Sequence, residues 1–326
     1  MEWLYKTSIK SLRGLRDSRL VRLPLSRQRI PPLLPWGDLE GSREVRREQR
    51  ALLLKNGARL PKRPQNLVGD QKRNSMARVF AIAADKGLVG TGVTGARRVL
   101  LPAVLKTHNP THCFVANEYV ANILGRFLGL PLPPGALTKS DDGLGFASLD
   151  FDLTGESLPP LDPGDCYKKM PDQSTGLVMF DIFIANPDRH NQNVCATLRD
   201  KPYDMIAFDH GHALFGHDKT QGIKRLEDLR DRLGISGGSA TKQNRHCLLD
   251  EILDSGFFEK WMIRIKTIPD HLIDASCEDV RDKGLIDFAE AAALKTFLKY
   301  RRDNFQTIVM NHKDEFKGIK QWGLPL

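Results

Sequence analysis

The chain has 326 residues, of which 40% are hydrophobic and 27% charged, so its composition is that of an ordinary folded protein with a sizeable core. No apolar run approaches the roughly 18 residues of a membrane span, which argues against a transmembrane protein. The net charge of +9 comes from residues 1–75, where 18 Lys and Arg face 7 Asp and Glu. The remainder is nearly neutral, which gives no support to a basic DNA-reading surface on the body.

Residues 1–75 differ in character from the rest of the chain. The stretch SLRGLRDSRLVRLPLSRQRIPPLLPWG is rich in Arg, Ser and Pro and shows neither helical nor strand periodicity. It fits a disordered basic tail, a transit-like segment, or an upstream extension from a misassigned start, in which case Met76 begins the protein. We favour a tail or an extension, because Glu2 and Asp17 are unusual in a transit segment.

The cysteines indicate a reducing compartment. The five of them are odd in number, scattered along the chain and never arranged as C-x-x-C. Such a pattern is typical of reduced thiols that are buried as small hydrophobic side chains, and not of a disulfide framework. We therefore expect a cytoplasmic protein.

Residues 76–155 are expected to form a small β-rich lobe with one main helix. Strands are predicted at 76–84 and 98–106, separated by the glycine-punctuated stretch DKGLVGTGVTG, and at 134–139 and 144–152, split by the turn SDDG. Residues 111–128 predict a helix, because apolar residues recur there at helical spacing. Pro110 precedes this helix, and Gly129 and Pro131 end it.

Residues 156–326 are expected to form a larger, helical lobe. A buried helix is predicted at 175–185, ending at Asn186-Pro187, with further helices at 225–233, 246–265 and 285–312. The charged, Gly/Ser-rich segment 216–246 fits either a substrate-facing loop or a solvated helix with a linker. The predicted fold class is therefore α+β, with a small sheet-bearing lobe before a larger helical one.

The stretch FDIFIANPDRHNQNV at 180–194 places an Asp, an Arg, a His and a later Asn directly after an apolar run. VCATL and YDMIAFD then fit two strands joined by the turn RDKP. If this hairpin is centred on Lys201, Asn193 and Asp209 face each other at its open end, roughly 5 Å apart at Cα. Asp188 lies at the same end. An amide oxygen and a carboxylate so placed can share one magnesium ion.

This set of side chains is what phosphoryl transfer from a nucleotide requires. Asp188 would accept or orient the hydroxyl of the acceptor, while Asn193 and Asp209 would hold the metal that bridges the nucleotide phosphates. The Asp-to-Asn spacing and the later Asp-x-Gly follow the protein-kinase catalytic and metal loops in outline. Two departures are that Arg189 and His190 follow the Asp, and that Asp-His-Gly stands in place of Asp-Phe-Gly.

NPDRHNQN followed by FDHGHALFG resembles the atypical kinases, namely the HipA-like kinases and the phosphatidylinositol kinases. DHGHALFG is most similar to the lipid-kinase metal loop. FVANEYVANILGRFLGLPLPP resembles the HipA-like helix that carries Asn-Glu and ends in Gly-Leu-Pro. The resemblance runs in order over roughly residues 79–309, and the two metal-binding motifs are its specific part. It implies a bilobal kinase fold with ATP between the lobes.

The resemblance also implies a strand lysine paired with a glutamate of the main helix, which would fix a cation at the α- and β-phosphates. Lys106 in PAVLKTHNP and Glu118 in ANEYVANILG occupy these positions, and small residues beside Glu118 leave room for the strand. Backbone amides of GLVGTGVTG, which contains Gly90 and Gly92, could cover the phosphates as a nest. Glycine turns between strands are equally common.

The leading hypothesis is an ATP- and Mg²⁺-dependent phosphotransferase of HipA-like type that acts on a protein serine or threonine, with autophosphorylation included. A lipid or small-molecule acceptor stays open because of the metal loop, although the body shows no basic, aromatic-bearing membrane face. Two alternatives are of another class. One is a nucleotide-binding pseudokinase or regulatory module, and the other is a nucleic-acid-binding protein that uses the leader 1–75.

Histidine-rich stretches near the candidate site also suggest a metal centre of another kind. DHGHALFGH and THNPTHC each lack a closed four-ligand set, so a structural zinc site is not favoured. We expect Arg189 and His190 to brace the catalytic loop instead. For Asp181 two roles stay open, an anchor for that loop or part of a capped core helix.

Overall fold

The computed structural model describes residues 82–89, 95–151, 161–198, 203–235 and 245–322. All of them belong to one compact unit of the chain, 66–326. The predicted leader 1–75 and the predicted lobe boundary at 155/156 lie outside the described residues. All five cysteines lie within them and are free thiols. None of the helices in these ranges combines the length and the apolar character needed to cross a membrane.

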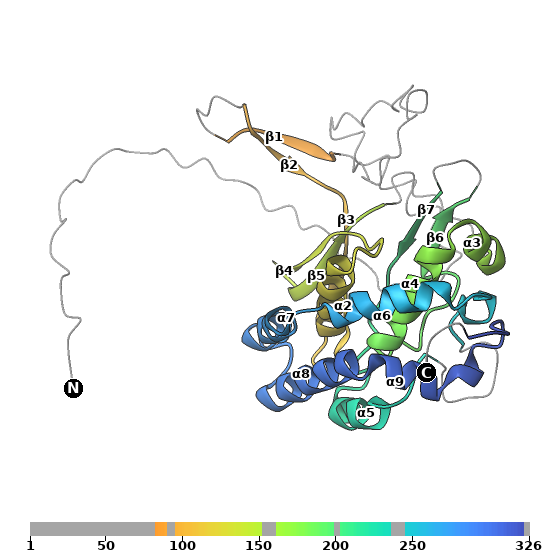
Figure 1. Cartoon of the computed structure of the whole chain (residues 1–326). Coiled ribbons are helices and arrows are strands. Elements are labelled where there is room, and N and C mark those ends of the chain that lie inside the picture. The colour runs from red at the N-terminus through yellow and green to blue at the C-terminus, as the bar shows by residue number, and fades with distance from the viewer. Residues whose placement is uncertain (1–81, 90–94, 152–160, 199–202, 236–244, 323–326) are drawn as a thin grey trace, which may run out of the picture. The chain divides into compact units, whose positions relative to one another are not determined.

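The first described part consists of two small antiparallel sheets (Figure 1). Strands β1 (Ala84–Leu88) and β2 (Arg97–Leu100) form a hairpin, and β3 (Ala103–Thr107), β4 (Gly135–Ser140) and β5 (Gly143–Leu149) form a second sheet in the order β3-β5-β4. The strand predicted at 98–106 is thus two strands, because Pro102 cannot donate to a ladder and interrupts the run. Of the strand predicted at 76–84, residues 76–81 lie outside the described part, and β1 begins where the prediction ends.

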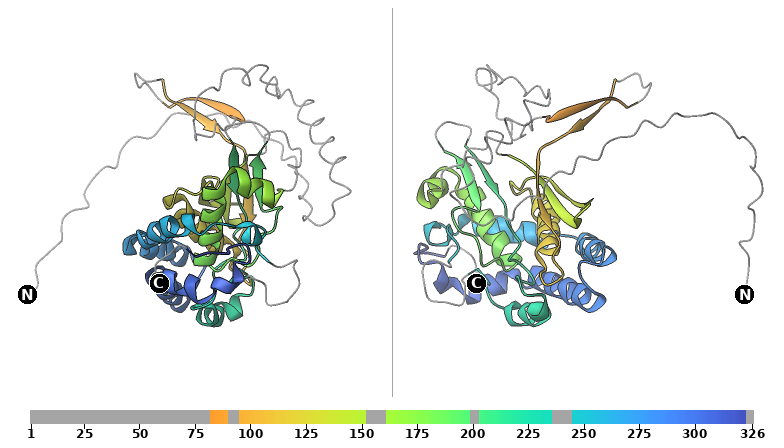
Figure 2. Two further views of the ribbon diagram at one scale, coloured as in Figure 1. Left: turned by 45° about the vertical axis from the view of Figure 1, so that its right-hand side comes forward. Right: turned by 180° about the vertical axis from the view of Figure 1, so that it is seen from behind.

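Helix α2 (Phe114–Phe127) is the main helix of this part, as predicted. It ends where Gly129 adopts a φ of +75°, a left-handed conformation that glycine takes without a steric penalty. The helix packs against β3, β4 and β5, and on another side against α7 (Asp270–Asp282) (Figure 2). A helix covered on two sides can bury polar residues, and Asn117, Glu118 and Asn122 are all buried.

The rest of the described chain is helical apart from one β-hairpin. Its helices are α3 (Pro163–Lys169), α4 (Pro171–Phe183), α5 (Gly222–Leu229), α6 (Gly256–Lys266), α7, α8 (Phe288–Asp303) and α9 (Phe305–Asn311). The hairpin consists of β6 (Val194–Thr197) and β7 (Asp204–Ala207). The predicted α+β class is confirmed: a small β-rich part with one main helix precedes a larger helical part.

Several helix predictions needed correction. Neither α3 nor α7 was predicted, and the helix predicted at 246–265 begins only at Gly256. His246 does not start a helix, because its buried ring lies 3.0 Å from a carboxylate oxygen of Asp181, in α4. The helix predicted at 285–312 is divided into α8 and α9 at Asn304.

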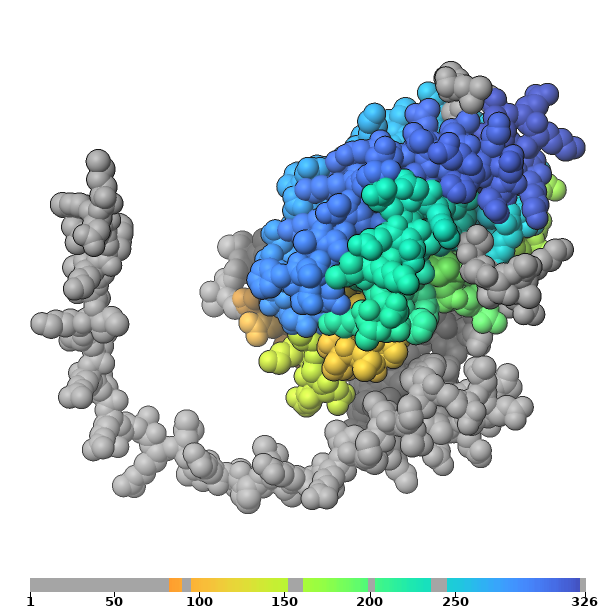
Figure 3. Space-filling model, turned by 90° about the horizontal axis from the view of Figure 1, so that it is seen from below, coloured from red at the N-terminus to blue at the C-terminus, as the bar shows by residue number. Residues whose placement is uncertain are grey.

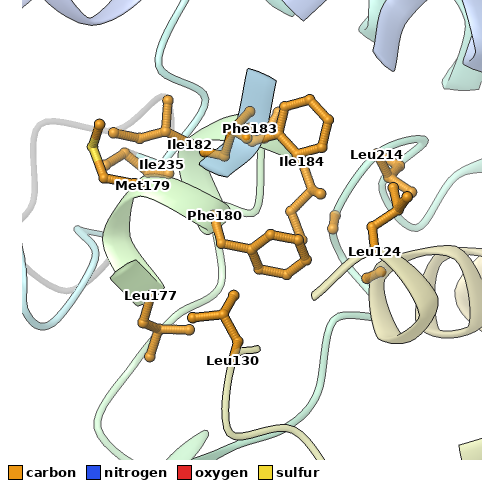
Figure 4. Packing of buried hydrophobic residues seen from close by; sticks show 14 of the residues in the cluster. Leu124, Leu130, Leu177, Met179, Phe180, Ile182, Phe183, Ile184, Leu214 and Ile235 are labelled. Atoms are coloured by element: carbon orange, nitrogen blue, oxygen red, sulfur yellow. The ribbon is translucent and has the colours of Figure 1, made fainter. Parts of the chain in front are cut away.

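Helix α4 forms the centre of the core and carries no exposed face. Its residues from Ser174 to Phe183 are all buried, and its side chains form one apolar cluster with Leu124 of α2 and with Leu130 (Figure 4). Across from it, the Trp261 indole of α6 lies over Gly176 and donates to the backbone oxygen of Asp172 at 2.9 Å. Such all-round burial requires every polar group of α4 to find a partner inside the protein.

Helices α5 and α8 are joined by a buried guanidinium (Figure 3 shows α5 beside the C-terminal helices). Arg301 donates to carbonyl oxygens near the end of α4, including Phe183 at 3.1 Å, and to those after α5, including Arg232 at 2.7 Å. Burial lowers the pKa of Arg301 to about 9. A cation at the carboxyl ends of two helices interacts favourably with both helix dipoles.

We expect Gly176→Ala to destabilise the protein. An alanine Cβ there would lie 2.2 Å from the Trp261 ring, so the indole or the helix must move. Overpacking of this kind costs about 1–3 kcal/mol, more than the roughly 0.5–1 kcal/mol that alanine gains over glycine in a helix. Urea unfolding of Gly176→Ala and of the matched variant Gln173→Ala, on the same helix, checks this. A Gly176→Ala protein as stable as the Gln173→Ala control would contradict the described packing.

Candidate active site

Lys106 connects the sheet, the main helix and the segment after β7. From the penultimate position of β3, its ammonium contacts Glu118 Oε1 of α2 and donates to Asp209 Oδ1 at 2.6 Å. The pairing of Lys106 with Phe146 on the central strand β5 sets the position of the lysine along the sheet. The predicted pair of Lys106 with Glu118 is thus present, and Asp209 joins it.

The environment keeps the Glu118 carboxylate ionised. Burial alone would raise its pKa, but His210 and the Lys106 ammonium lower it to about 2. His210 Nδ1 lies 3.8 Å from the second carboxylate oxygen of Glu118. For Lys106, burial works against the charge, yet the two carboxylates raise its pKa. Both partners are therefore charged at neutral pH, and a fixed cation remains at this place in the site.

Asn117 is a site residue that the sequence reasoning missed. It is fully buried beside Glu118 and donates through its amide to the carbonyl oxygens of Gly211 at 2.6 Å and Gly216 at 3.0 Å. The signal available in the sequence was a pair of consecutive polar residues on a predicted helix, next to its apolar stripe. Through these bonds α2 holds the segment after Asp209 in place.

A second buried ion pair organises the loop after α4. Asp181 and Arg189 are both inaccessible to solvent, with Arg189 Nε donating to Asp181 Oδ2 at 2.8 Å. Arg189 also donates to the carbonyl oxygen of Asn193 at 2.9 Å and to that of Phe208. Asn186 donates to Asp181 Oδ1 at 2.9 Å. Of the two open roles for Asp181, the structure supports the loop anchor, and Arg189 braces the loop as predicted.

The pKa of Asp181 follows from these contacts. Burial would raise it, but the Arg189 guanidinium and the bond from His246 hold it well below its usual range. The carboxylate is therefore ionised across the physiological range. By contrast, the ring of His190, also predicted to brace the loop, forms a weaker local contact, with its Nδ1 3.3 Å from the amide of Gln192.

Asp188 and Asn193 lie together within this loop. The Asn193 side-chain amide donates to the backbone oxygen of Asp188 at 2.9 Å, and the Asp188 backbone amide donates to Asn186 Oδ1 at 3.2 Å. The Asp188 carboxylate is partly exposed and lies 3.8 Å from His212 Nε2. The NH₂ group of Asn193 is thus bonded to the backbone. Its amide oxygen has no hydrogen-bond partner among the described residues, so this oxygen is the atom that could bind a metal.

The register of the β6–β7 hairpin corrects the predicted opposition of Asn193 and Asp209. Val194 pairs with Ala207, so Asn193 faces Phe208, whose amide donates to its carbonyl at 3.2 Å. A one-residue offset would turn a regular strand side chain to the other face. Asp209 has left the ladder, however, and with a φ of +60° its carboxylate reaches Lys106. The predicted turn at 199–202 lies outside the described residues.

The donor atoms present suit a magnesium ion bound together with phosphates. Asn193 and Asp209 supply an amide oxygen and a carboxylate, the hard ligands that Mg²⁺ takes when it also keeps waters and substrate oxygens. In the described part of the chain, no cluster of three or more His, Cys, Asp or Glu could hold a metal by itself. Gly90 and Gly92, predicted to cover the phosphates, lie outside the described residues.

Four aromatic and imidazole rings gather beside the loop of Asp188. His112 stacks on Phe114 with ring centroids 4.8 Å apart, and Phe114 and His217 lie 5.1 and 6.0 Å from His212. The two histidine-rich stretches considered separately in the sequence thus meet in space. His112 Nδ1 lies 2.8 Å from the His217 carbonyl oxygen, and His212 is the one of these rings that also approaches the Asp188 carboxylate among the described residues.

Solved structures similar to the chain include a kinase and a protein of a toxin–antitoxin system. The Helicobacter pylori proinflammatory kinase CtkA matches at 16% identity and a TM-score of 0.46, covering 67% of this chain and 94% of that chain. HipA of Shewanella oneidensis MR-1, in a complex with HipB and operator DNA, matches at 13% identity and a TM-score of 0.33, covering 87% and 75%. No protein-family model and no curated protein matches the chain. At this similarity only folds are compared, so we infer function from the contacts of the site.

We expect Asp181→Asn to lower the free energy of unfolding by about 3–5 kcal/mol at neutral pH, because Arg189 would keep a buried charge without its counter-charge. The depressed pKa of Asp181 contributes stability that is present above its unfolded value of about 3.9 and is lost as the pH falls below it. The variant should therefore lose less stability than the wild type on acidification.

Urea unfolding at several pH values between neutral and acid measures both effects. Asp282→Asn is a matched control, because Asp282 is exposed and pairs with Arg281 at the surface, where an ion pair contributes about 0–1 kcal/mol. Equal stability losses in the two variants would show that the buried pair does not organise the loop.

Proposed function

We propose that the protein is an ATP- and Mg²⁺-dependent phosphotransferase of HipA-like type, with a protein serine or threonine as its acceptor. The observation that carries the proposal is the position of Lys106, which joins Glu118 of the main helix to Asp209 of the metal loop. Charged groups of a strand, of a helix and of the segment after β7 are thus in contact. Protein kinases need such a set of charges to bind nucleotide phosphates and their metal.

Each residue has a separate role in this proposal. Lys106, held by Glu118, would bind the α- and β-phosphates of ATP, and Asn193 and Asp209 would hold magnesium against the phosphate oxygens. Bound magnesium neutralises the charge that develops on the transferred group. Asp188 would accept the proton of the acceptor hydroxyl, and its partly exposed carboxylate is open to an incoming group.

Two features of the structure support these roles. The backbone of the loop is held from inside by Arg189, so Asp188 can keep its place without a side-chain bond to a neighbouring carbonyl. Asn117 holds the segment after Asp209 to α2, so the distance between Glu118 and the proposed metal loop stays fixed. Preorganised positions of this kind are the main contribution of a protein to phosphoryl transfer.

We expect Asp188→Ala to leave ATP binding nearly unchanged and to reduce transfer by at least about 10²-fold, the usual contribution of a positioned general base. In Asp209→Asn, magnesium-dependent ATP binding itself should be lost, because the ion loses its carboxylate ligand. Calorimetry with ATP and Mg²⁺, and label transfer from γ-labelled ATP to the protein itself, measure the two effects.

The acceptor panel in this assay would include seryl and threonyl proteins, phosphoinositide vesicles and small alcohols, since a lipid or small-molecule kinase would use the same groups. Labelled lipid without labelled protein would correct the acceptor class. ATP binding with no transfer to any acceptor would identify a pseudokinase, and equal transfer by wild type and Asp188→Ala would refute the catalytic assignment.

We expect Lys106→Met to weaken ATP binding and turnover together by about 10- to 100-fold, because a charge-assisted hydrogen bond contributes about 1.5–3 kcal/mol. Lys139→Met is the matched control, since Lys139 is exposed on β4 of the same sheet. Steady-state kinetics over a range of ATP concentrations separates the two quantities. A response of Lys106→Met no larger than that of the control would exclude Lys106 from the nucleotide site.

A further inference from the structure

Two turns in left-handed conformation lie next to the proposed catalytic and metal loops. Among the described residues, Ala185, Asp209 and Leu214 are the non-glycine residues with positive φ, at 50°, 60° and 50°. Ala185 stands three residues before Asp188, and Leu214 follows Asp209 by five. Neither alanine nor leucine favours this conformation, because Cβ approaches the following carbonyl oxygen. Surrounding contacts must therefore hold both turns.

Arg225 of α5 contacts both of these turns. Its Nε donates to the carbonyl oxygen of Leu214 and one of its terminal nitrogens donates to the carbonyl oxygen of Ala185, each at 3.0 Å. The turns are also joined directly, since the Leu214 amide donates to Ile184 O at 2.9 Å. One planar guanidinium thus spans the start of the loop that carries Asp188 and the end of the segment that carries Asp209.

The surroundings of Arg225 indicate that this placement is specific. No carboxylate in the described part of the chain forms an ion pair with it, and burial lowers its pKa. A Cβ on Gly216, which has a φ of +72°, would lie 3.0 Å from Arg225 Cδ. A Cβ on Gly234, also at +72°, would lie 2.7 Å from the Ala185 Cβ. Two glycines therefore leave the room that the guanidinium and the Ala185 turn occupy.

We infer that Arg225 is a positioning residue, which sets the distance between the acceptor-handling Asp188 and the metal-binding Asp209 by holding the Ala185 and Leu214 turns on one guanidinium. This inference rests on the proposed function for its catalytic consequence. ATP itself would be held mainly through Lys106, whose described ion pairs are with Glu118 of α2 and with Asp209, and not with a residue of α5. The loss of Arg225 should therefore act on the transfer step more than on nucleotide binding.

The experiment compares Arg225→Ala, Arg225→Lys and Lys224→Ala in the full chain. We expect kcat to fall by about 10- to 100-fold in Arg225→Ala, since a displacement of about 1 Å at reacting groups costs this much. KM for ATP should change little. Arg225→Lys keeps the charge and the stem but offers one ammonium to two carbonyls, so its kcat should also fall. Lys224→Ala, at the exposed neighbouring position, should behave as the wild type.

Guanidinium ions added to Arg225→Ala should restore part of its kcat, whereas methylammonium at the same concentration should not. A purely structural role would predict a lower melting temperature without this selective rescue. Unchanged kcat in both Arg225 variants, or equal rescue by the two ions, would overturn the inference.

Amide hydrogen exchange provides a test that needs no kinase activity. In Arg225→Ala and Arg225→Lys, the amides of Leu214 and Asn186 should exchange at least about 10-fold faster than in Lys224→Ala, while those of α8 stay unchanged. A wild type without any transfer activity would refute the proposed function and leave this test intact. Unchanged exchange at both turns would refute the role of Arg225, whatever the activity.

Discussion

The buried pair of Asp181 and Arg189 is the interaction on which the site depends most. The Arg189 guanidinium donates to the carbonyl oxygens of Asn193, just before β6, and Phe208, just after β7. The Asp181 carboxylate belongs to α4, whose residues from Ser174 to Phe183 are all buried. Removing two charges from water is costly, and only a full set of partners compensates for it. Here those partners include backbone carbonyl oxygens of the loops. The buried charges are therefore compensated only when the loops keep this position.

The main helix α2 also holds parts of the candidate site in place, through two of its buried polar residues. Adjacent residues of that helix, Asn117 and Glu118, bind the backbone after Asp209 and the Lys106 ammonium, respectively. Because α2 packs against all three strands of the sheet, a shift of the helix would move both contacts together. Lys106 and the segment after Asp209 are thereby coupled through a single rigid element, as the proposed binding of nucleotide phosphates and a metal would require.

Arginines that donate to backbone carbonyl oxygens recur in the described structure. Arg301 and Arg225 both donate to carbonyl oxygens instead of carboxylates, one after α4 and α5 and the other at two left-handed turns. Backbone carbonyls left without partners at the ends of helices and in irregular loops must be satisfied once they are buried. A guanidinium, with its five donors in a fixed plane, can satisfy several of them and remain charged.

Much of the fold could be predicted from local patterns. The strands β4 and β5 follow from their residue types and the turn between them, and helix α2 follows from apolar periodicity and from the glycine and proline after it. Helix α4 follows from a continuous apolar run that ends before a proline. Helix α7 could not be recognised in this way, because its buried stripe includes Ser276 and Cys277 and most of its other residues are charged. The helix predicted from 246 failed for the opposite reason: a helix-compatible stretch is held in another conformation by the bond of His246 to Asp181.

The order and spacing of the polar residues were enough to select Asp188, Asn193 and Asp209, because hard ligands are recognisable by type. Lys106 and Glu118 joined this candidate site through the resemblance to the HipA-like kinases. Their arrangement was decided by tertiary contacts. The hairpin register differs by one residue from the predicted one, and the left-handed conformation of Asp209 directs its carboxylate to Lys106. Asn117 and Arg225 act through backbone carbonyls of segments distant in sequence. A carbonyl acceptor is present at every residue, so no sequence pattern distinguishes the ones that folding brings to these side chains.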